Sequence, residues 1–145
     1  MINVTSPATK DEFKAYYALR YKVLSEPWGH ARGTEKDDFE VLSEHFMALD
    51  GESGAVLGVV KLFEKTPGVG QFSHLAVHPR HQRQGIGGLL LEAVEKRARA
   101  RGFGALGATT HANGTAYLEK HGYHVAGVQP AHLGLSHVVW LEKEL

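Results

Sequence analysis

The sequence contains no cysteine among its 145 residues. Disulfides, thiolate nucleophiles and cysteine-ligated zinc are therefore excluded. The sequence also has no excess of charge of either sign, because 16 Lys and Arg residues balance 16 Asp and Glu residues. Domains that bind duplex nucleic acid usually carry a basic excess, so nucleic acid is not an expected partner.

Long hydrophobic runs are absent as well. No stretch approaches the roughly 18 apolar residues of a membrane-spanning helix. The first residues, MINVTSPATKDEF, have neither the basic start nor the apolar run of a signal peptide. These absences predict a cytoplasmic protein with no membrane partner. With 43% hydrophobic and 22% charged residues, we expect a single globular domain over residues 1–145.

Hydrophobic periodicity predicts strands and helices in alternation. We expect strands near residues 2–5, 45–50, 55–65, 70–78, 105–110, 123–128 and 138–142, and helices from Ser6 or Thr9 to Pro27, from residue 86 to Gly102 and over 113–121. Residues 29–44 show no period and are predicted to form a surface loop. This order predicts an α/β or α+β fold in which helices cover both faces of a sheet.

The second of these helices has a strongly apolar side. Its expected buried face consists of Ile86, Leu89, Leu90, Ala93, Val94 and Ala98. Its expected solvent face consists of Glu92, Glu95, Lys96, Arg99 and Arg101.

The start of this helix carries the most informative motif. The sequence RHQRQGIGG, residues 80–88, places three glycines where a helix exposes unpaired backbone N–H groups and a partial positive charge. Glycines let a ligand approach these amides, and Arg80 and Arg83 add positive charge. A pyrophosphate is the ligand that fits. The motif is neither a P-loop nor a dinucleotide fingerprint, since Leu90 stands where the latter needs glycine.

The six residues QRQGIG, 82–87, resemble the Gln/Arg-x-x-Gly-x-Gly/Ala pattern by which the GNAT acyltransferase superfamily holds the pyrophosphate of coenzyme A. The longer stretch LAVHPRHQRQGIGGLLLEAVEKRARARG resembles that family's fourth strand, pyrophosphate loop and third helix, and NGTAYLEKHGY resembles its next helix. The resemblance implies a mixed, mostly antiparallel central sheet with helices on both faces.

The resemblance also implies an activity, the transfer of an acetyl group from acetyl-CoA directly to a primary amine of a small molecule or peptide, without a metal. It implies that the cofactor is bound by backbone groups or side chains of Leu75, Ala76, Val77, Gln82, Arg83, Gln84, Gly85, Ile86, Gly87, Gly88 and Asn113. Asn113 is equally well explained as a helix N-cap. The tyrosines and Arg20 of the first helix, together with Trp28, resemble one wall of the acceptor site.

Two proton-transfer residues are expected. His74 lies near the expected thioester and has a near-neutral intrinsic pKa, so it is the candidate general base. Glu44, Glu64 and His111 are alternatives without a sequence signature.

The candidate general acid is Tyr117. The family's usual acid is the tyrosine five positions before the closing aromatic, but this position, counted from Tyr123, holds Leu118. One residue along a helix is a turn of about 100°, so Tyr117 would point into the core unless the helix shifts.

A metal site and a function without catalysis are the alternatives to this assignment. Histidines 74, 78 and 81 do not suggest a metal site, because strand alternation places 74 and 78 on one face while Pro79 directs 81 elsewhere. A module that binds coenzyme A without catalysis is the alternative function, favoured by Leu118 at the acid position. The acceptor, and whether the protein is a monomer or a homodimer, stay open.

Overall fold

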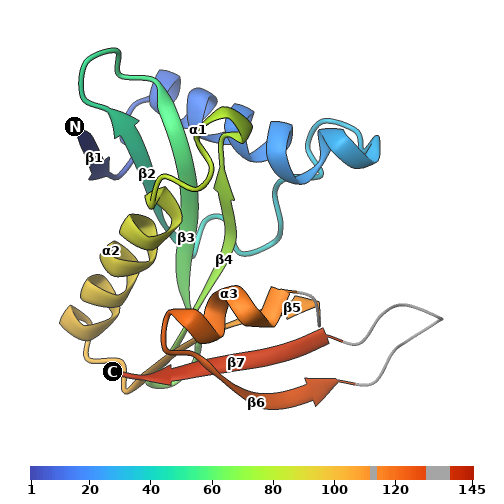
Figure 1. Ribbon diagram of the computed structural model, residues 1–145, viewed down its shortest axis with the longest axis vertical. Helices are drawn as coiled ribbons and strands as arrows, with labels where there is room; N and C mark the ends of the chain where they lie inside the picture. The colour runs from blue at the N-terminus through green and yellow to red at the C-terminus, as the bar shows by residue number, and fades with distance from the viewer. Residues whose placement is uncertain (112–113, 130–137) are drawn as a thin grey trace. The chain divides into compact units, whose positions relative to one another are not determined.

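The computed structural model describes residues 1–111, 114–129 and 138–145, and within them it forms one seven-stranded sheet with flanking helices (Figure 1). The elements are β1 Ile2–Thr5, α1 Lys10–Leu24, η1 Glu26–Trp28, β2 Glu44–Asp50, β3 Val56–Thr66, β4 Val69–Val77, η2 Pro79–His81, α2 Ile86–Ala100, β5 Ala105–His111, α3 Thr115–Lys120, β6 His124–Gln129 and β7 Val138–Glu144. This sequence of elements matches the expected order.

The strand order is β1-β2-β3-β4-β5-β7-β6. The pairs β1/β2, β2/β3, β5/β7 and β6/β7 are antiparallel, and β4 pairs with β5 in parallel over Val69–Gln71. The prediction of a mixed, mostly antiparallel sheet is therefore confirmed. Parallel pairing thus occurs between β4 and β5, which are neighbours in the sheet.

The chain forms two compact units. The N-terminal unit comprises Met1–Phe63 and His74–Val94, and the C-terminal unit comprises Glu64–Ser73 and Glu95–Leu145. That all 145 residues behave as one domain stays a prediction.

In the N-terminal unit, helices cover both faces of the strands. Tyr16 and Leu19 of α1 pack in one buried cluster with Met47, Val59 and Ala76 of β2, β3 and β4. Gly58 precedes Val59 and so faces the other side of the sheet. A Cβ atom at Gly58 would lie 2.9 Å from Leu90 Cδ1 of α2, so α2 covers that other face closely.

Local sequence explains where the first helix begins. Thr9 accepts a hydrogen bond from the Glu12 amide at 3.1 Å, and Glu12 Oε1 accepts one from the Thr9 amide at 2.9 Å, which makes a capping box. Of the two expected starts, Thr9 is the one observed. After Trp28, residues 29–43 form turns and no regular helix or strand, as predicted for the surface loop.

The C-terminal unit is held together around Glu95. This side chain is 9% exposed, and its carboxylate accepts hydrogen bonds from Tyr123 Oη at 2.8 Å and from Lys143 Nζ at 3.1 Å. The Tyr123 ring also packs edge-on against Phe72 of β4, with ring centroids 5.6 Å apart. The last turn of α2 is thereby fixed to β4 and β7.

The expected faces of α2 need correction. Leu89 is 38% exposed, whereas Leu91 is only 1% exposed, and Glu95, expected in solvent, is buried. At 100° per residue, Ile86, Leu91 and Glu95 bound one buried side, and Leu89 points roughly 140° away from its centre. Glu95 is buried because both of its oxygens have partners.

Candidate active site

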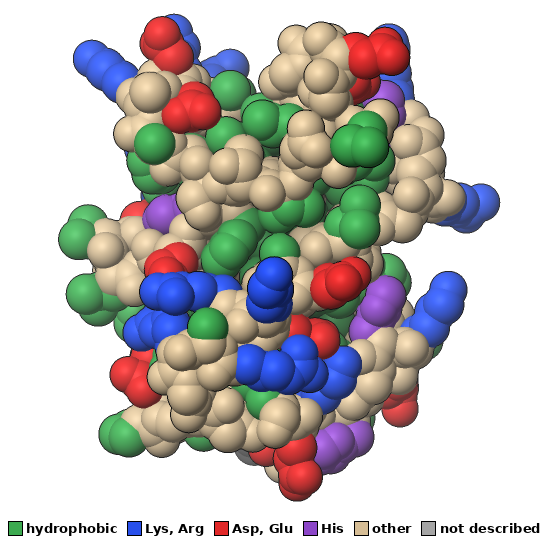
Figure 2. All heavy atoms as spheres, turned by 90° about the vertical axis from the view of Figure 1, so that its left-hand side faces the viewer, with side chains coloured by type: hydrophobic (Ala, Val, Ile, Leu, Met, Phe, Trp, Pro, Cys, Tyr) green, Lys and Arg blue, Asp and Glu red, His purple; other side chains and the backbone are tan. Residues whose placement is uncertain are grey.

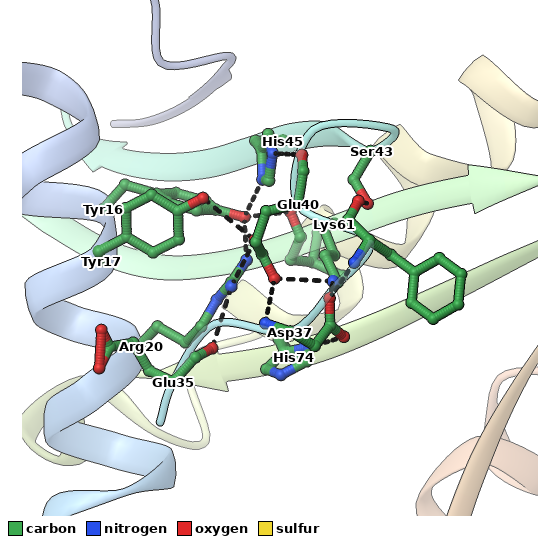
Figure 3. Close-up of polar contacts among 12 residues, drawn as sticks. Tyr16, Tyr17, Arg20, Glu35, Asp37, Glu40, Ser43, His45, Lys61 and His74 are labelled. Atoms are coloured by element: carbon green, nitrogen blue, oxygen red, sulfur yellow. Dashed lines mark hydrogen bonds and ion pairs between the residues drawn. The ribbon is translucent and has the colours of Figure 1, made fainter. Parts of the chain in front are cut away.

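One face of α1 supplies the first part of a buried polar cluster (Figure 3). Tyr16 and Arg20 lie one turn apart, and neither side chain is exposed to solvent. Arg20 Nη2 donates a hydrogen bond to Tyr16 Oη at 2.7 Å, and the guanidinium carbon lies 4.9 Å from the centroid of the Tyr17 ring. The arginine is thus stacked among aromatic rings and directed at the loop of residues 29–43.

Glu40 of this loop meets the arginine. Its Oε1 accepts from Arg20 Nη1 at 2.7 Å and from Tyr17 Oη at 3.1 Å, while its Oε2 accepts from Lys61 Nζ at 2.8 Å. Burial alone would raise the pKa of the Glu40 carboxyl, but hydrogen bonds from Lys61, the backbone and Arg20 outweigh it and hold this pKa well below its usual range. Glu40 is therefore a carboxylate at neutral pH, bound on both oxygens.

Lys61 projects from β3 and completes the cluster. Its side chain is fully buried, and its Nζ also bonds to Asp37 Oδ1. The two cations, Arg20 and Lys61, are thus matched by two carboxylates, Asp37 and Glu40. Opposite charges at such distances offset the cost of burying each one. We call Tyr16, Arg20, Asp37, Glu40, His45 and Lys61 the buried charge cluster.

His45 of β2 closes the cluster on the side of α1. Its Nδ1 lies 2.8 Å from Tyr16 Oη, and its Nε2 lies 2.9 Å from the Glu40 carbonyl oxygen. Burial lowers the pKa of His45, so the ring is neutral at pH 7. The Nε2 proton then points to the carbonyl, and Nδ1 accepts from the tyrosine hydroxyl.

His74, the predicted base, lies beside this cluster. Its φ is +56° although it stands within β4, an uncommon backbone conformation for a residue with a side chain. Its Nδ1 is 4.0 Å from Asp37 Oδ2. Burial, with the charges of Arg20 and Lys61, lowers the pKa of His74 to about 4, against the opposing effect of Asp37. The imidazole is therefore neutral at pH 7.

The predicted cofactor residues Leu75, Ala76 and Val77 follow His74 on β4. Ala76 is 3% exposed and belongs to the core beneath α1, whereas Leu75 and Val77 are half-buried. The chain then leaves the strand through the 3-10 turn η2 and enters the predicted phosphate loop.

The phosphate loop has the shape that an anion site needs. Gln82, Arg83, Gln84 and Gly85 are exposed, and Arg83 and Gly85 have φ values of +64° and +80°. The Gln82 side-chain amide donates to the Val77 carbonyl at 3.3 Å, which ties the loop to the end of β4.

The start of α2 carries the backbone amides that the predicted site requires. A Cβ atom at Gly85 would meet no atom within 4 Å, so the space beside the helix start is open. Ile86 is buried in the core and Gly87 is also buried, while Gly88 is half-buried. First-turn amides have no intrahelical partner, so these residues fit a diphosphate.

Tyr117 does not point into the core. It is 43% exposed, whereas Leu118 is 6% exposed and takes the buried position. The Tyr117 ring lies 4.8 Å from the ring of His121, and burial raises its pKa, so its hydroxyl is protonated at pH 7. Asn113 lies outside the residues that the structure describes.

The remaining candidates are less supported. Glu64 is exposed and accepts from the Gly68 amide at 3.1 Å, which is a turn contact, and His111 is exposed at the end of β5. Glu44 is half-buried at the start of β2. Within residues 1–111, 114–129 and 138–145, no three His, Asp or Glu side chains are grouped as a metal site would require.

Comparison with known proteins identifies the family. Residues 10–123 match the model of the Acetyltransferase (GNAT) family. The uncharacterized N-acetyltransferase YjcF of Bacillus subtilis (strain 168) is 26% identical over 116 residues, 80% of this chain and 81% of that protein. The chain therefore belongs to the GNAT acetyltransferase family and is an N-acetyltransferase by class.

Solved structures share the fold. A Lactobacillus plantarum protein superposes with a TM-score of 0.86 at 23% identity, over 99% of this chain and 98% of that chain. A GNAT family acetyltransferase from Elizabethkingia anophelis, solved with acetyl-CoA bound, gives a TM-score of 0.78 at 20% identity, over 99% and 98% of the two chains. Among the helices described here, none has the length and apolar character to cross a bilayer.

Sequence reasoning missed most of the buried charge cluster. Arg20 was expected only as part of an acceptor wall, and Asp37, Glu40, His45 and Lys61 were not singled out. One signal was present, since Lys61 interrupts the apolar run VLGVVKLF, residues 56–63 of β3, which is buried from residue 57 to residue 63. A lysine in such a run predicts a buried partner carboxylate.

Proposed function

We propose that this protein transfers the acetyl group of acetyl-CoA directly to a primary amine of a small molecule or peptide. The observation that carries the proposal is the loop before α2. Arg83 and Gly85 have left-handed φ values, and the exposed residues Gln82–Gly85 stand directly before the first turn of α2. The acetyl-CoA bound to the Elizabethkingia anophelis relative supports the choice of donor.

Acetyl-CoA supplies an acetyl group as a thioester. In the proposal, backbone amides from Gln82 to Gly88 hold the diphosphate. Backbone groups of Leu75, Ala76 and Val77 bind the pantetheine arm and stabilise the negative charge that develops on the thioester oxygen.

Proton transfer is assigned to two neutral side chains. The amine nitrogen forms a bond to the acetyl carbon while the carbon–sulfur bond breaks, and the sulfur keeps the electron pair. His74 accepts the proton that the amine loses, directly or through a water molecule. Tyr117 donates its phenolic proton to the leaving thiolate, because its raised pKa keeps it protonated at pH 7.

The phosphate loop is tested by charge reversal at one position. We expect Arg83→Glu to weaken coenzyme A binding at least tenfold, because the new carboxylate repels the diphosphate. Lys96→Glu is the matched control, because it makes the same change of charge at an exposed position. Lys96 lies about 15 Å along α2 from the first residue of the helix. This distance exceeds the length over which salt at physiological concentration screens a charge. Isothermal titration with coenzyme A should leave the control within about twofold of wild type. Equal affinities for the two variants would place the diphosphate elsewhere.

A module that binds coenzyme A without catalysis is the second candidate. The observation that favours it is Leu118, buried at the position of the usual acid. Thiol release from acetyl-CoA, measured with a panel of alkylamines, aminoglycosides and peptide N-termini, separates the two. Amine-dependent release supports the transferase, and tight coenzyme A binding without release for any amine supports the module.

A further inference from the structure

Asp37 is fixed in place by three hydrogen bonds, two at one carboxylate oxygen and one at its backbone N–H. Its Oδ1 accepts from Lys61 Nζ and from the Phe39 amide, the latter at 2.9 Å. Its backbone N–H donates to Glu40 Oε2 at 3.0 Å. Lys61 is fully buried on β3, so it anchors the carboxylate to the sheet rather than to the loop alone. The carboxylate of a surface loop is thereby held in one orientation.

The second oxygen of Asp37 is directed at the predicted base. Asp37 Oδ2 lies 4.0 Å from His74 Nδ1, and the two side chains are 37% and 23% exposed. Figure 3 shows them side by side below Lys61. The charged groups around His74 are Arg20 from α1, Lys61 from β3, and Asp37 and Glu40 from the loop. Asp37 is placed with one carboxylate oxygen 4.0 Å from a ring nitrogen.

We propose that Asp37 is a positioning residue, which favours the Nδ1–H tautomer of His74 and leaves the lone pair on Nε2 for the amine proton. The inference rests on the proposed function of His74 as general base. Asp37 itself touches no reacting atom. A carboxylate beside one ring nitrogen holds the proton there and stabilises the imidazolium that forms when the other nitrogen accepts a proton.

This role follows from the surroundings of His74. Two buried cations near the ring oppose proton uptake, and Asp37 is the carboxylate close enough to offset them at the ring itself. Hydrogen bonds of catalytic residues are often long without substrate and shorten in the complex, so the 4.0 Å separation is compatible with a pair that tightens. The loop of residues 29–43 is then part of the catalytic machinery through Asp37.

The tautomer can be measured directly in the wild-type protein. Long-range proton–nitrogen NMR distinguishes Nδ1–H from Nε2–H imidazole rings, and loss of one signal set in His74→Gln assigns His74 among the ten histidines. We expect Nδ1–H at pH 7. A dominant Nε2–H form in the wild type would overturn the proposal, whatever any variant does.

The carboxylate is tested by Asp37→Asn against Asp38→Asn. Asp38 is the next residue, is exposed and carries the same charge, so it is a matched control. We expect Asp37→Asn to shift His74 toward the Nε2–H tautomer and to lower its pKa, because a negative charge beside the ring has been removed. Asp38→Asn should reproduce the wild-type spectrum. An Asp37→Asn spectrum identical to wild type would contradict the proposal.

Kinetics test the consequence for transfer. We expect Asp37→Asn to lower kcat about tenfold with KM for acetyl-CoA within about twofold, and Asp37→Asn/His74→Gln to be no slower than His74→Gln alone. Additive losses would overturn the proposal. If the wild type binds coenzyme A but acetylates no amine, the proposed function fails, and the tautomer measurement still decides whether Asp37 positions His74.

Discussion

Arg20 and Lys61 are two fully buried cations in a protein whose net formal charge is zero. An isolated buried charge is very costly, but each cation here has carboxylate partners within hydrogen-bond distance. Buried ion pairs contribute little net stability relative to apolar residues, although removing one partner is strongly destabilising. The chain keeps this arrangement beside His74, where it fixes the Asp37 carboxylate and shifts the histidine pKa. At the level of single residues, the cluster is best explained by the site it supports.

Tyr117 provides the sharpest test of the acid. We expect Tyr117→Phe to lower kcat about tenfold or more, because the leaving thiolate loses its proton donor. The hydroxyl is part of a side chain that is 43% exposed, so stability should change by less than about 0.5 kcal/mol. Steady-state kinetics and thermal unfolding on the same preparation separate the two effects.

Full activity in Tyr117→Phe would remove this residue from the mechanism. The converse variant, Leu118→Tyr, would place a tyrosine at the family's usual acid position, but it is a poorer test of the acid. Leu118 is buried, and inserting a larger side chain into a packed site costs about 1–3 kcal/mol. Loss of activity there would report strain rather than chemistry.

At the scale of elements, the strands and helices were predictable because each has a local signal. Turn glycines and proline bound the strands, and Thr9 with Glu12 marks the start of α1. The faces of α2 were less predictable, since Leu89 and Leu91 are equally apolar and only the surface that the helix packs against decides which is buried. Burial of Glu95 needs Tyr123 and Lys143, which lie far along the chain.

The candidate site also has one part with a local sequence signal and one part without. The candidate phosphate loop could be proposed from sequence because its residues, 80–88, form one contiguous motif at one helix start. The buried charge cluster joins residues of α1, the 29–43 loop, β2 and β3, so no local pattern contains it. Asp37 and Asp38 are neighbouring carboxylates in the sequence, and tertiary proximity to Lys61 and His74 sets the first apart.

The packing of α2 against β3 positions the phosphate loop, and Gly58 tests this coupling. A Cβ atom there would lie 2.9 Å from Leu90 Cδ1 and 3.0 Å from Ile86 Cγ2. We expect Gly58→Ala to cost about 1–3 kcal/mol of unfolding free energy and to weaken coenzyme A binding, because Ile86 in the first turn must move. Urea unfolding and calorimetric titration measure the two effects.

Gly104→Ala is the control for Gly58→Ala. A Cβ atom at Gly104 meets nothing within 4 Å, so this variant should stay within about 0.5 kcal/mol of wild type and bind coenzyme A normally. If Gly58→Ala behaves like Gly104→Ala in both measurements, α2 is not held against β3 as closely as the packing implies.

For the whole molecule, charge is balanced in number, with 16 Lys and Arg residues and 16 Asp and Glu residues. On the face shown in Figure 2, lysine and arginine side chains lie beside acidic ones rather than forming a field of one sign. Such a surface gives no strong attraction for a polyanion, in keeping with the zero formal net charge. The pH sensitivity of the protein therefore depends on its buried groups, above all those of the charge cluster.

From the pKa values of these groups we expect the free energy of unfolding to fall as the pH is lowered below 7. The pKa of His74 is lowered from 6.5 to about 4 in the folded protein, so between these pH values the unfolded chain binds more protons and is favoured. The carboxyl of Glu40 also has a depressed pKa, so its contribution is present above pH 4.5 and is lost as pH falls further. We expect urea unfolding to show a loss of about 2 kcal/mol between pH 7 and pH 4.5, allowing for the partial exposure of His74.

His74→Gln separates the two contributions to this acid sensitivity. Without the imidazole, stability should change little between pH 7 and pH 5, apart from the smaller contribution of His45, whose pKa is also lowered by burial. The decline below pH 4.5 should persist, because Glu40 still has to be protonated against Arg20 and Lys61. A wild-type protein equally stable at pH 7 and pH 5 would mean that His74 is not held neutral by its surroundings, and the basis for its role as a base would be lost.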